Sequence, residues 1–281
     1  MNCPEYHIPV MLAEAVEGLA LRRGGVYIDA TFGGGGHSRE ILRRMDAESR
    51  LFAFDQDADA QRNVPDGEGR LTFVQSNFRW MRNWMRYYGI EQVDGILADL
   101  GVSSHHFDTA ERGFSFRHDG ALDMRMNQRG GRTAADIVAS YSAEQLTDIL
   151  RLYGEVRNPQ RMAQLMVRAR DEQPIATTSR LTEVLTGSPE PSPAAKKEMA
   201  RVFQALRIEV NNEMTALRAM LEAATQLLRP GGRLVVLTYH SLEDRMVKNM
   251  MRAGNVEGRV QQDFYGRTLA PLHPVGKAAT A

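Results

Sequence analysis

The sequence predicts an α/β fold of the doubly wound, Rossmann-like class, and three observations support this. Strand-like apolar runs alternate with helical patterns over residues 26–101, which favours a parallel sheet. A glycine-rich loop directly follows the first run. The alternation resumes near residue 214, after a long stretch of helical pattern alone. We therefore predict one domain made of 1–102 and 214–281, interrupted by an all-α insertion over 103–213.

The individual strands and helices follow from local patterns. The run VYIDA, which starts at Val26, is apolar and contains β-branched residues, and HSREILRRM after the glycine loop has apolar residues at helical spacing. Further strands are expected at 50–57, 71–78, 93–101 and 233–240. Further helices are expected from Ala58, over 79–89, over 211–228 before a turn at 229–232, and over 241–252.

The insertion has five segments with helical periodicity, separated by a Gly- and Arg-rich loop at 128–132 and a Pro- and Ser-rich stretch at 188–194. Between Arg151 and Val210 there are ten basic and seven acidic residues. This small surplus is compatible with contact to phosphates, although on helices such charges usually form only a solvated surface.

Composition narrows the class of protein. The 281 residues carry 35 basic and 35 acidic side chains, 43% are hydrophobic and the mean hydropathy is −0.39, as in soluble globular proteins. This composition excludes disordered and collagen-like proteins. A membrane-spanning protein is excluded because no apolar run approaches the roughly 20 residues that cross a bilayer. The first residues do not form a signal peptide, and the single Cys3 has no disulfide partner. We expect a cytoplasmic protein without a membrane partner.

The loop DATFGGGGHS at 29–38 is the first candidate site. Its glycines allow close approach of a ligand to the backbone, and the free N–H groups at the start of the following helix favour negative groups. The G-x-G-x-x-G spacing of dinucleotide enzymes is met only loosely, by Gly33, Gly35 and Ser38. The alternative is a tight turn.

Two residues near the ends of the second and third strands add to this site. Asp55 lies 20 residues beyond Gly35, where an acid commonly accepts hydrogen bonds from ribose hydroxyls. The alternative is a solvated loop acid beside Asp57. Phe78, at the end of the third strand, is a candidate to cover an adenine ring, and its alternative is a place in the core.

Asp99 ends the fourth strand, in DLGVSSHHFD. Ligands of open parallel sheets bind outside the carboxyl ends of the strands, so Asp99 is expected to face the same ligand as the glycine loop and Asp55. Its carboxylate is suited to orient an amino group. The alternative is a cap on the following turn.

No catalytic metal is predicted. The histidines that lie near the expected site have neither cysteine partners nor H-E-x-x-H spacing: His37, His105, His106 and His240. The G-x-S-x-G elbow of hydrolases and the P-loop of phosphotransferases are also absent from the sequence.

Several sequence blocks together resemble one known family. They are HIPVMLAEAV (7–16), YIDATFGGGGHS (27–38), DLGVSS (99–104), ERGFSF with LDMRM (111–126), FQALRIEVNNE (203–213) and PGGRLVVLTYHSLEDRMVK (230–248). In this order they are similar to the bacterial 16S rRNA (cytosine-N4)-methyltransferases of the RsmH (MraW) type. The glycine loop alone is unspecific, but the combination of the other blocks is highly specific.

The resemblance implies an enzyme that uses S-adenosylmethionine to methylate N4 of a cytosine in the small ribosomal subunit, nucleotide 1402 of 16S rRNA in the decoding centre. It implies a Rossmann-like core, an inserted domain that helps to hold RNA, and no metal. The implied cofactor contacts are Gly35, Gly36, His37, Asp55, Phe78, Asp99 and His106, the last at a position where the family usually has Gln.

Candidate substrate contacts come from two motifs. RGFSF and LDMRM lead out of the fourth strand, and we expect Arg112, Phe114 and Arg125 to border the substrate channel; the alternative is that aromatic and Met side chains there anchor the insertion. YHSLEDR follows the last strand, and its candidates are His240, Ser241 and Arg245. The alternative for Ser241 is a helix cap. Asp99 is the candidate catalytic residue, as acceptor of the amino proton.

Two rival functions remain at this point. An NAD-dependent oxidoreductase would share the glycine loop and Asp55. The chain also closes as APLHPVGKAATA, whereas members of the family that it resembles end in an Arg-rich segment and a further strand. The second rival is therefore a cofactor- and RNA-binding protein that lacks activity and has an open sheet edge. The sequence does not indicate the oligomeric state.

Overall fold

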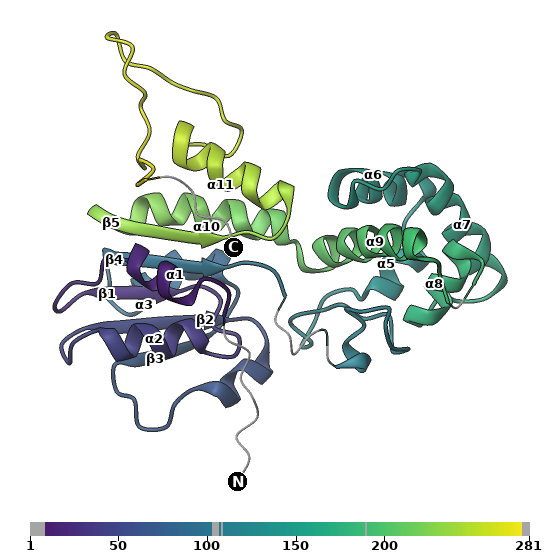
Figure 1. Ribbon diagram of the computed structural model, residues 1–281, viewed down its shortest axis with the longest axis horizontal. Coiled ribbons are helices and arrows are strands. Elements are labelled where there is room, and N and C mark those ends of the chain that lie inside the picture. Colours follow the sequence, from purple (N-terminus) through teal and green to yellow (C-terminus); the bar gives the residue numbers. More distant parts are fainter. Residues whose placement is uncertain (1–8, 103–106, 108, 189, 277–281) are drawn as a thin grey trace. The chain divides into compact units, whose positions relative to one another are not determined.

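The computed structural model describes residues 9–102, 107, 109–188 and 190–276 (Figure 1). His106, one of the expected cofactor contacts, lies outside the described residues. The chain divides into two compact units, which we call unit 1 (Met1–Gly101 with Met214–Ala281) and unit 2 (Val102–Glu213). Each is described by itself below.

Unit 1 is built on a parallel five-stranded sheet with the order β3-β2-β1-β4-β5. The strands are β1 (Val26–Asp29), β2 (Arg50–Asp55), β3 (Leu71–Gln75), β4 (Val93–Asp99) and β5 (Leu228–Leu237). The chain proceeds from β1 to β2 and β3 on one side, and to β4 and β5 on the other. The order therefore reverses between β1 and β4, which is where open α/β sheets bind their ligands.

Helices cover both faces of this sheet, which confirms the predicted fold class. Side chains alternate across each strand, so Ile28 and Ile96 face one cluster while Tyr27 and Leu97 face the other. The elements of unit 1 outside the sheet are α1 (Leu12–Gly18), α2 (Gly36–Arg44), the 3₁₀ helices η1 (Ala58–Asn63) and η2 (Phe78–Trp80), α3 (Met81–Tyr87), α10 (Glu213–Leu227, whose first residue ends unit 2) and α11 (Ser241–Ala253).

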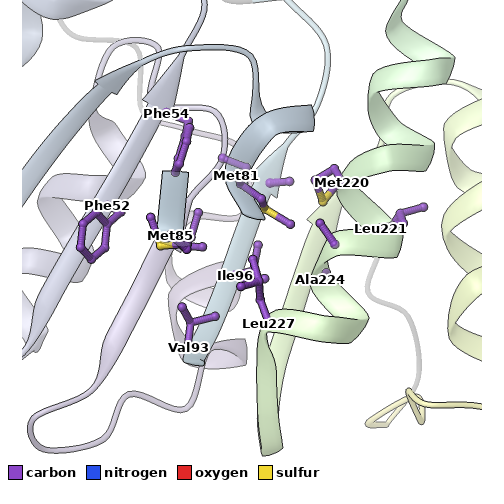
Figure 2. Packing of buried hydrophobic residues seen from close by; sticks show 14 of the residues in the cluster. Phe52, Phe54, Met81, Met85, Val93, Ile96, Met220, Leu221, Ala224 and Leu227 are labelled. Carbon is purple, nitrogen blue, oxygen red and sulfur yellow. The ribbon is translucent and has the colours of Figure 1, made fainter. Parts of the chain in front are cut away.

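The larger cluster joins α3 and α10 to the sheet. Met81 and Met85 of α3, Met220 of α10 and Phe54 and Ile96 of the sheet are fully or almost fully buried in it (Figure 2). Burial of such side chains stabilises a fold by about 1.5–3 kcal/mol each, before entropy is counted. The cluster therefore holds the strand ends, and the loops that leave them, in fixed positions.

The structure corrects three of the predicted elements. The third strand was expected to reach Phe78 but ends at Gln75, because the side chain of Asn77 accepts the backbone N–H of Arg79 and starts η2. The turn expected at 229–232 is instead part of β5, whose register opposite β4 is irregular there. The helix expected from Ala58 is a 3₁₀ helix.

Unit 2 has its own hydrophobic core, formed by side chains from its helices. Its elements are η3 (Ala110–Arg112), α5 (Ala134–Ser140), α6 (Ala143–Gly154), α7 (Pro159–Glu172), α8 (Thr178–Thr186) and α9 (Pro193–Asn211). Capping boxes start α5 at Thr133 and α6 at Ser142, each with the residue three positions later. Within the described chain, every helix falls short of the length and apolarity that a bilayer crossing requires.

Candidate functional site

The glycine loop lies between β1 and α2, and its conformation requires glycine. Gly33 and Gly35 have φ angles of 50° and 75°, in the left-handed region that other residues rarely adopt. A Cβ atom at Gly35 would lie 2.9 Å from the ring of Phe32, and one at Gly36 would lie 2.2 Å from Cγ of Pro9. The loop is therefore a close-packed turn whose backbone leads directly into the N-terminus of α2.

Asp55 holds this loop in place. Its Oδ2 accepts a hydrogen bond from the backbone N of Gly33 (2.7 Å), and its Oδ1 accepts one from the N of Asp57 (2.8 Å). The alternative for Asp55 was a solvated loop acid beside Asp57, but Asp55 is half-buried and bonded to the loop, and Asp57 is buried and caps η1. The carboxylate of Asp55 therefore lies directly against the backbone of the loop.

A second acid, Asp29, is buried at the end of β1. Its Oδ2 accepts from Oγ of Ser38 (2.6 Å) and its Oδ1 accepts from the backbone N of Thr31 (3.0 Å). The hydroxyl of Thr31 accepts in turn from the backbone N of Asp99 (2.7 Å), so β1 and β4 are tied together where the strand order reverses. Burial raises the pKa of Asp29.

Asp99 lies at the end of β4. Its Oδ1 accepts a hydrogen bond from the hydroxyl of Tyr239 (2.6 Å), and its Oδ2 is 3.6 Å from Nδ1 of His37. Burial raises the pKa of Asp99, and the hydrogen bond from Tyr239 opposes that change. Among the described residues no group donates a hydrogen bond to Oδ2, so this oxygen is free to accept one from a ligand.

His37 follows the glycine loop in α2 and is almost fully buried. Its Nε2 has no hydrogen-bond partner among the residues that the structure describes. Leaving a buried polar atom unpaired costs about 1–3 kcal/mol. This atom therefore points to a ligand or a water molecule next to the glycine loop.

Tyr239, two residues after the end of β5, and Glu243 of α11 complete the cluster. The backbone N of Tyr239 donates to Oε2 of the buried Glu243 (2.9 Å), and Oε1 of Glu243 is 3.1 Å from Nε2 of His240. Burial and the bond to Asp99 raise the pKa of Tyr239, so its hydroxyl keeps its proton at neutral pH. The ring is 53% exposed.

The remaining candidates of YHSLEDR lie at the start of α11. The helix cap considered for Ser241 is wrong, because His240 occupies the cap position and Ser241 is the first helical residue. The side chain of His240 is mostly buried beside Glu243. Arg245 is exposed one turn further along the helix.

Phe78 begins η2 and is half-buried against the larger core cluster. Its neighbour Asn77 donates from Nδ2 to Oε1 of Gln56 (2.8 Å), which joins the turns that follow β3 and β2. Part of the Phe78 ring therefore has a structural role, and part remains open to solvent.

The candidates in unit 2 are held differently. Arg112 is buried and donates from Nη2 to the carbonyls of Arg125 (3.0 Å) and Met126 (3.2 Å). Phe114 is buried in the core of this unit, and Arg125 forms a bidentate pair with Asp123. These contacts support the alternative in which this segment anchors the insertion.

The sequence interpretation assigned no individual contact to four residues of the cluster, although they lie in its motifs: Asp29, Thr31, Ser38 and Tyr239. Asp29 offered a signal, because an acid inside an otherwise apolar strand needs a specific partner. Tyr239 belonged to a recognised motif, but its contact to Asp99 joins residues 140 positions apart. Only the pairing of β4 with β5 makes that contact visible.

Comparison with known proteins places the chain in a family. The profile of the MraW methylase family matches residues 5–265. The chain is 58% identical to ribosomal RNA small subunit methyltransferase H of Phocaeicola vulgatus, over 95% of this chain and 87% of that protein. The protein of the same name from Porphyromonas gingivalis is 53% identical, over 98% of this chain and 91% of that protein. Matches of this extent show that the chain belongs to the MraW methylase family.

Proposed function

We propose that the protein transfers a methyl group from S-adenosylmethionine to N4 of a cytosine in 16S rRNA, at nucleotide 1402 in the decoding centre of the small ribosomal subunit. Membership of a methylase family and relatives named for methylation of small-subunit rRNA support the reaction class and the substrate class. The observation that carries the proposal is Oδ2 of Asp99 beside the glycine loop, which lies 3.6 Å from Nδ1 of His37 and accepts no hydrogen bond from the described residues. Such an acceptor suits an amino group that must be oriented and deprotonated.

The residues around the loop fit the proposed cofactor. The ribose hydroxyls of S-adenosylmethionine can donate hydrogen bonds to Asp55. Its carboxylate can accept hydrogen bonds from the N–H groups at the start of α2. The unpaired Nε2 of His37 provides a further polar contact. Gly35, Gly36, Phe78, Asp99 and His106 complete the proposed set, and no step requires a metal.

The reaction itself places few demands on the protein. S-adenosylmethionine supplies an electrophilic methyl group bonded to a sulfonium, which an amine attacks in line. The lone pair of cytosine N4 is delocalised into the ring, so N4 is a weak nucleophile. Asp99 compensates by accepting an N4 hydrogen at Oδ2 and taking the proton as the new N–C bond forms. The raised pKa of Asp99 makes its carboxylate a better base for this step.

Tyr239 keeps Asp99 in position for this role. Its hydroxyl donates a hydrogen bond to Oδ1 of Asp99. This bond leaves Oδ2 to face the substrate. Gly101 leaves room for the ring, since a Cβ there would lie 3.3 Å from Cδ2 of Tyr239. We assign the exposed face of this ring to stacking on the target base, which must leave its own stack to react. His240, Ser241 and Arg245 follow on the same segment and provide further polar contacts.

We assign recognition of the surrounding RNA in part to unit 2. Its modest surplus of basic residues between Arg151 and Val210 supports contact with phosphates. Arg112 and Phe114 stabilise the segment that carries Arg125 rather than touching RNA themselves. The partner is thus the rRNA of the small subunit, in the cytoplasm, and no membrane is involved.

The decisive experiment uses methyl-labelled S-adenosylmethionine and small ribosomal subunits from cells that lack the enzyme. Label recovered as N4-methylcytosine at the expected nucleotide supports the proposal. Cofactor binding without transfer would favour the binding protein that lacks activity, and preference for NADH over S-adenosylmethionine would favour an oxidoreductase. Subunits that already carry the modification serve as the control.

A further inference from the structure

A short segment on the surface of unit 1 combines aromatic and basic side chains that, apart from Phe78 at its start, belong to no part of the site described above. It comprises η2, α3 and the residue after α3. We call it the α3 patch and define it by these residues: Arg79, Trp80, Arg82, Trp84, Arg86, Tyr87 and Tyr88.

Three of the four aromatic residues of the α3 patch are exposed, and the fourth, Trp84, packs partly against the larger core cluster. Trp80 is 48% exposed, Tyr87 76% and Tyr88 37%. The Trp84 ring stacks on Tyr88 with centroids 6.2 Å apart and meets Tyr87 edge to face at 5.7 Å. Large aromatic side chains normally contribute to a core, so a rigid exposed cluster of them indicates a binding surface.

Helical geometry explains how the patch is displayed. Met81 and Met85 are fully buried against the sheet and fix the orientation of α3 (Figure 2). The spacing of Trp80, Trp84, Tyr87 and Tyr88 places these rings along one side of the segment. About eight residues separate the first ring from the last, a rise of roughly 12 Å, which is long enough for more than one base.

The charges of the patch have a single sign. Between Gln75 and Ile90 there are three arginines and no acidic residue. Several arginines elsewhere in unit 1 pair with acids, as Arg43 does with Glu40 and Arg218 with Glu257. Among the described residues none offers a carboxylate to Arg79, Arg82 or Arg86, and the guanidinium of Arg79 lies over the ring of Trp80 at 4.9 Å.

We propose that the α3 patch binds a single-stranded segment of RNA, with bases stacked on its aromatic rings and phosphates paired with its arginines. Exposed rings interleaved with basic side chains are what proteins use to hold single strands without reading their sequence. A second copy of the chain fits less well, because two identical patches would bring arginines against arginines. This inference rests on the proposed function only for the source of the RNA.

The position of the α3 patch in unit 1 suits it to hold RNA next to the proposed site. η2 begins three residues after β3, at the carboxyl edge of the sheet where the glycine loop and Asp99 also lie. α3 then runs back along the sheet, as a helix between parallel strands does. A strand of rRNA held by α3 therefore flanks the nucleotide that reaches the site.

The test measures binding of a fluorescently labelled single-stranded RNA of about 12 nucleotides, with the S-adenosylmethionine affinity of each variant measured in parallel. We expect the exposed-ring variant Trp80→Ala/Tyr87→Ala to bind RNA about tenfold or more weakly. We expect Arg82→Gln/Arg86→Gln to lower the slope of log affinity against log salt by about one to two. The matched controls Tyr265→Ala and Arg23→Gln, at exposed positions outside the patch, should leave RNA affinity unchanged.

Three results separate the alternatives. Unchanged RNA affinity in both patch variants, with cofactor affinity retained, would overturn the inference. Loss of self-association in sedimentation without loss of RNA binding would overturn it in favour of a second copy. If the patch variants lose RNA binding while the wild-type protein fails to methylate small subunits, the inference stands and the proposed function fails. The arginine variant guards against misfolding, because it removes no ring from the cluster.

Discussion

The carboxyl edge of the sheet and the segment 112–126 of unit 2 both carry distinctive motifs. They differ in how their polar side chains are hydrogen-bonded. At the sheet edge, Asp99 has a raised pKa and one oxygen without a donor among the described residues, and Nε2 of His37 is unpaired. In unit 2, Arg112 donates to two carbonyls and Arg125 is paired in a bidentate manner.

This difference distinguishes residues suited to a chemical role from residues that stabilise the fold. Polar groups that are buried and fully paired stabilise a fold, whereas groups that are buried and partly unpaired are kept at a cost in stability. The contacts of Arg112 and Arg125 give RGFSF and LDMRM a structural role within unit 2. The second kind marks the site. Four substitutions test this contrast, in order of expected effect.

The largest effect is expected for Asp99→Asn. Asparagine keeps the shape and can still accept from Tyr239, but it cannot take a proton, so single-turnover methylation should fall by about 10³-fold or more. Because the folded state raises the pKa of Asp99, its ionised form disfavours folding at neutral pH, and the variant should unfold at the same temperature or higher. An unchanged chemical rate would remove Asp99 from catalysis.

For Phe114→Ala we expect the opposite of the Asp99 variant, namely a loss of stability without a loss of cofactor binding. Removing this buried ring should lower the free energy of unfolding of unit 2 by about 3–4 kcal/mol while cofactor affinity is kept. Both tryptophans, Trp80 and Trp84, lie in unit 1, so tryptophan fluorescence follows that unit in urea while circular dichroism at 222 nm also reports the helices of unit 2. A loss of cofactor affinity with unchanged stability would contradict the assignment of Phe114 to architecture.

An intermediate effect is expected in the glycine loop. Gly35→Ala combines a positive φ with a contact of 2.9 Å to Phe32, and it should weaken S-adenosylmethionine binding by roughly tenfold, measured by calorimetry. Gly33→Ala is the matched control, because it has a positive φ but nothing within 4 Å of the new Cβ. Equal losses in the two variants would show that backbone strain alone is responsible.

The smallest effect is expected for Tyr239→Phe, in the pH profile. The hydrogen bond from Tyr239 lowers the pKa of Asp99, so removing it lets that pKa rise further. In the proposed mechanism Asp99 acts when ionised, so activity should fall as the pH drops through its pKa. The acid limb of the pH profile of kcat/KM should therefore move to higher pH. The variant Asp99→Glu, which keeps the negative charge, serves as a comparison. A limb that stays in place would exclude this role for Tyr239.

The sequence predicted much of unit 1 because its signals are local. The apolar runs, the glycine loop and the acids at strand ends each follow from a few neighbouring residues, and the parallel sheet with helices on both faces is confirmed. The end of the third strand was wrong by three residues, since a single side-chain bond from Asn77 decides it. The spacing that selected Asp55 led to a residue that does adjoin the loop, through its bond to Gly33.

What the sequence determined by itself was therefore the fold class and the list of polar residues that follow the strands, because periodicity and turn chemistry depend on adjacent positions. What only the tertiary structure decided was the partner of each group. Asp99 meets Tyr239 because β4 pairs with β5, and Thr31 reaches Asp99 because β1 pairs with β4. Strand order joins residues that are far apart in the chain. It gives Asp99 a donor at Oδ1 and, among the described residues, none at Oδ2, while Arg112 donates to two carbonyls close to it in its own unit.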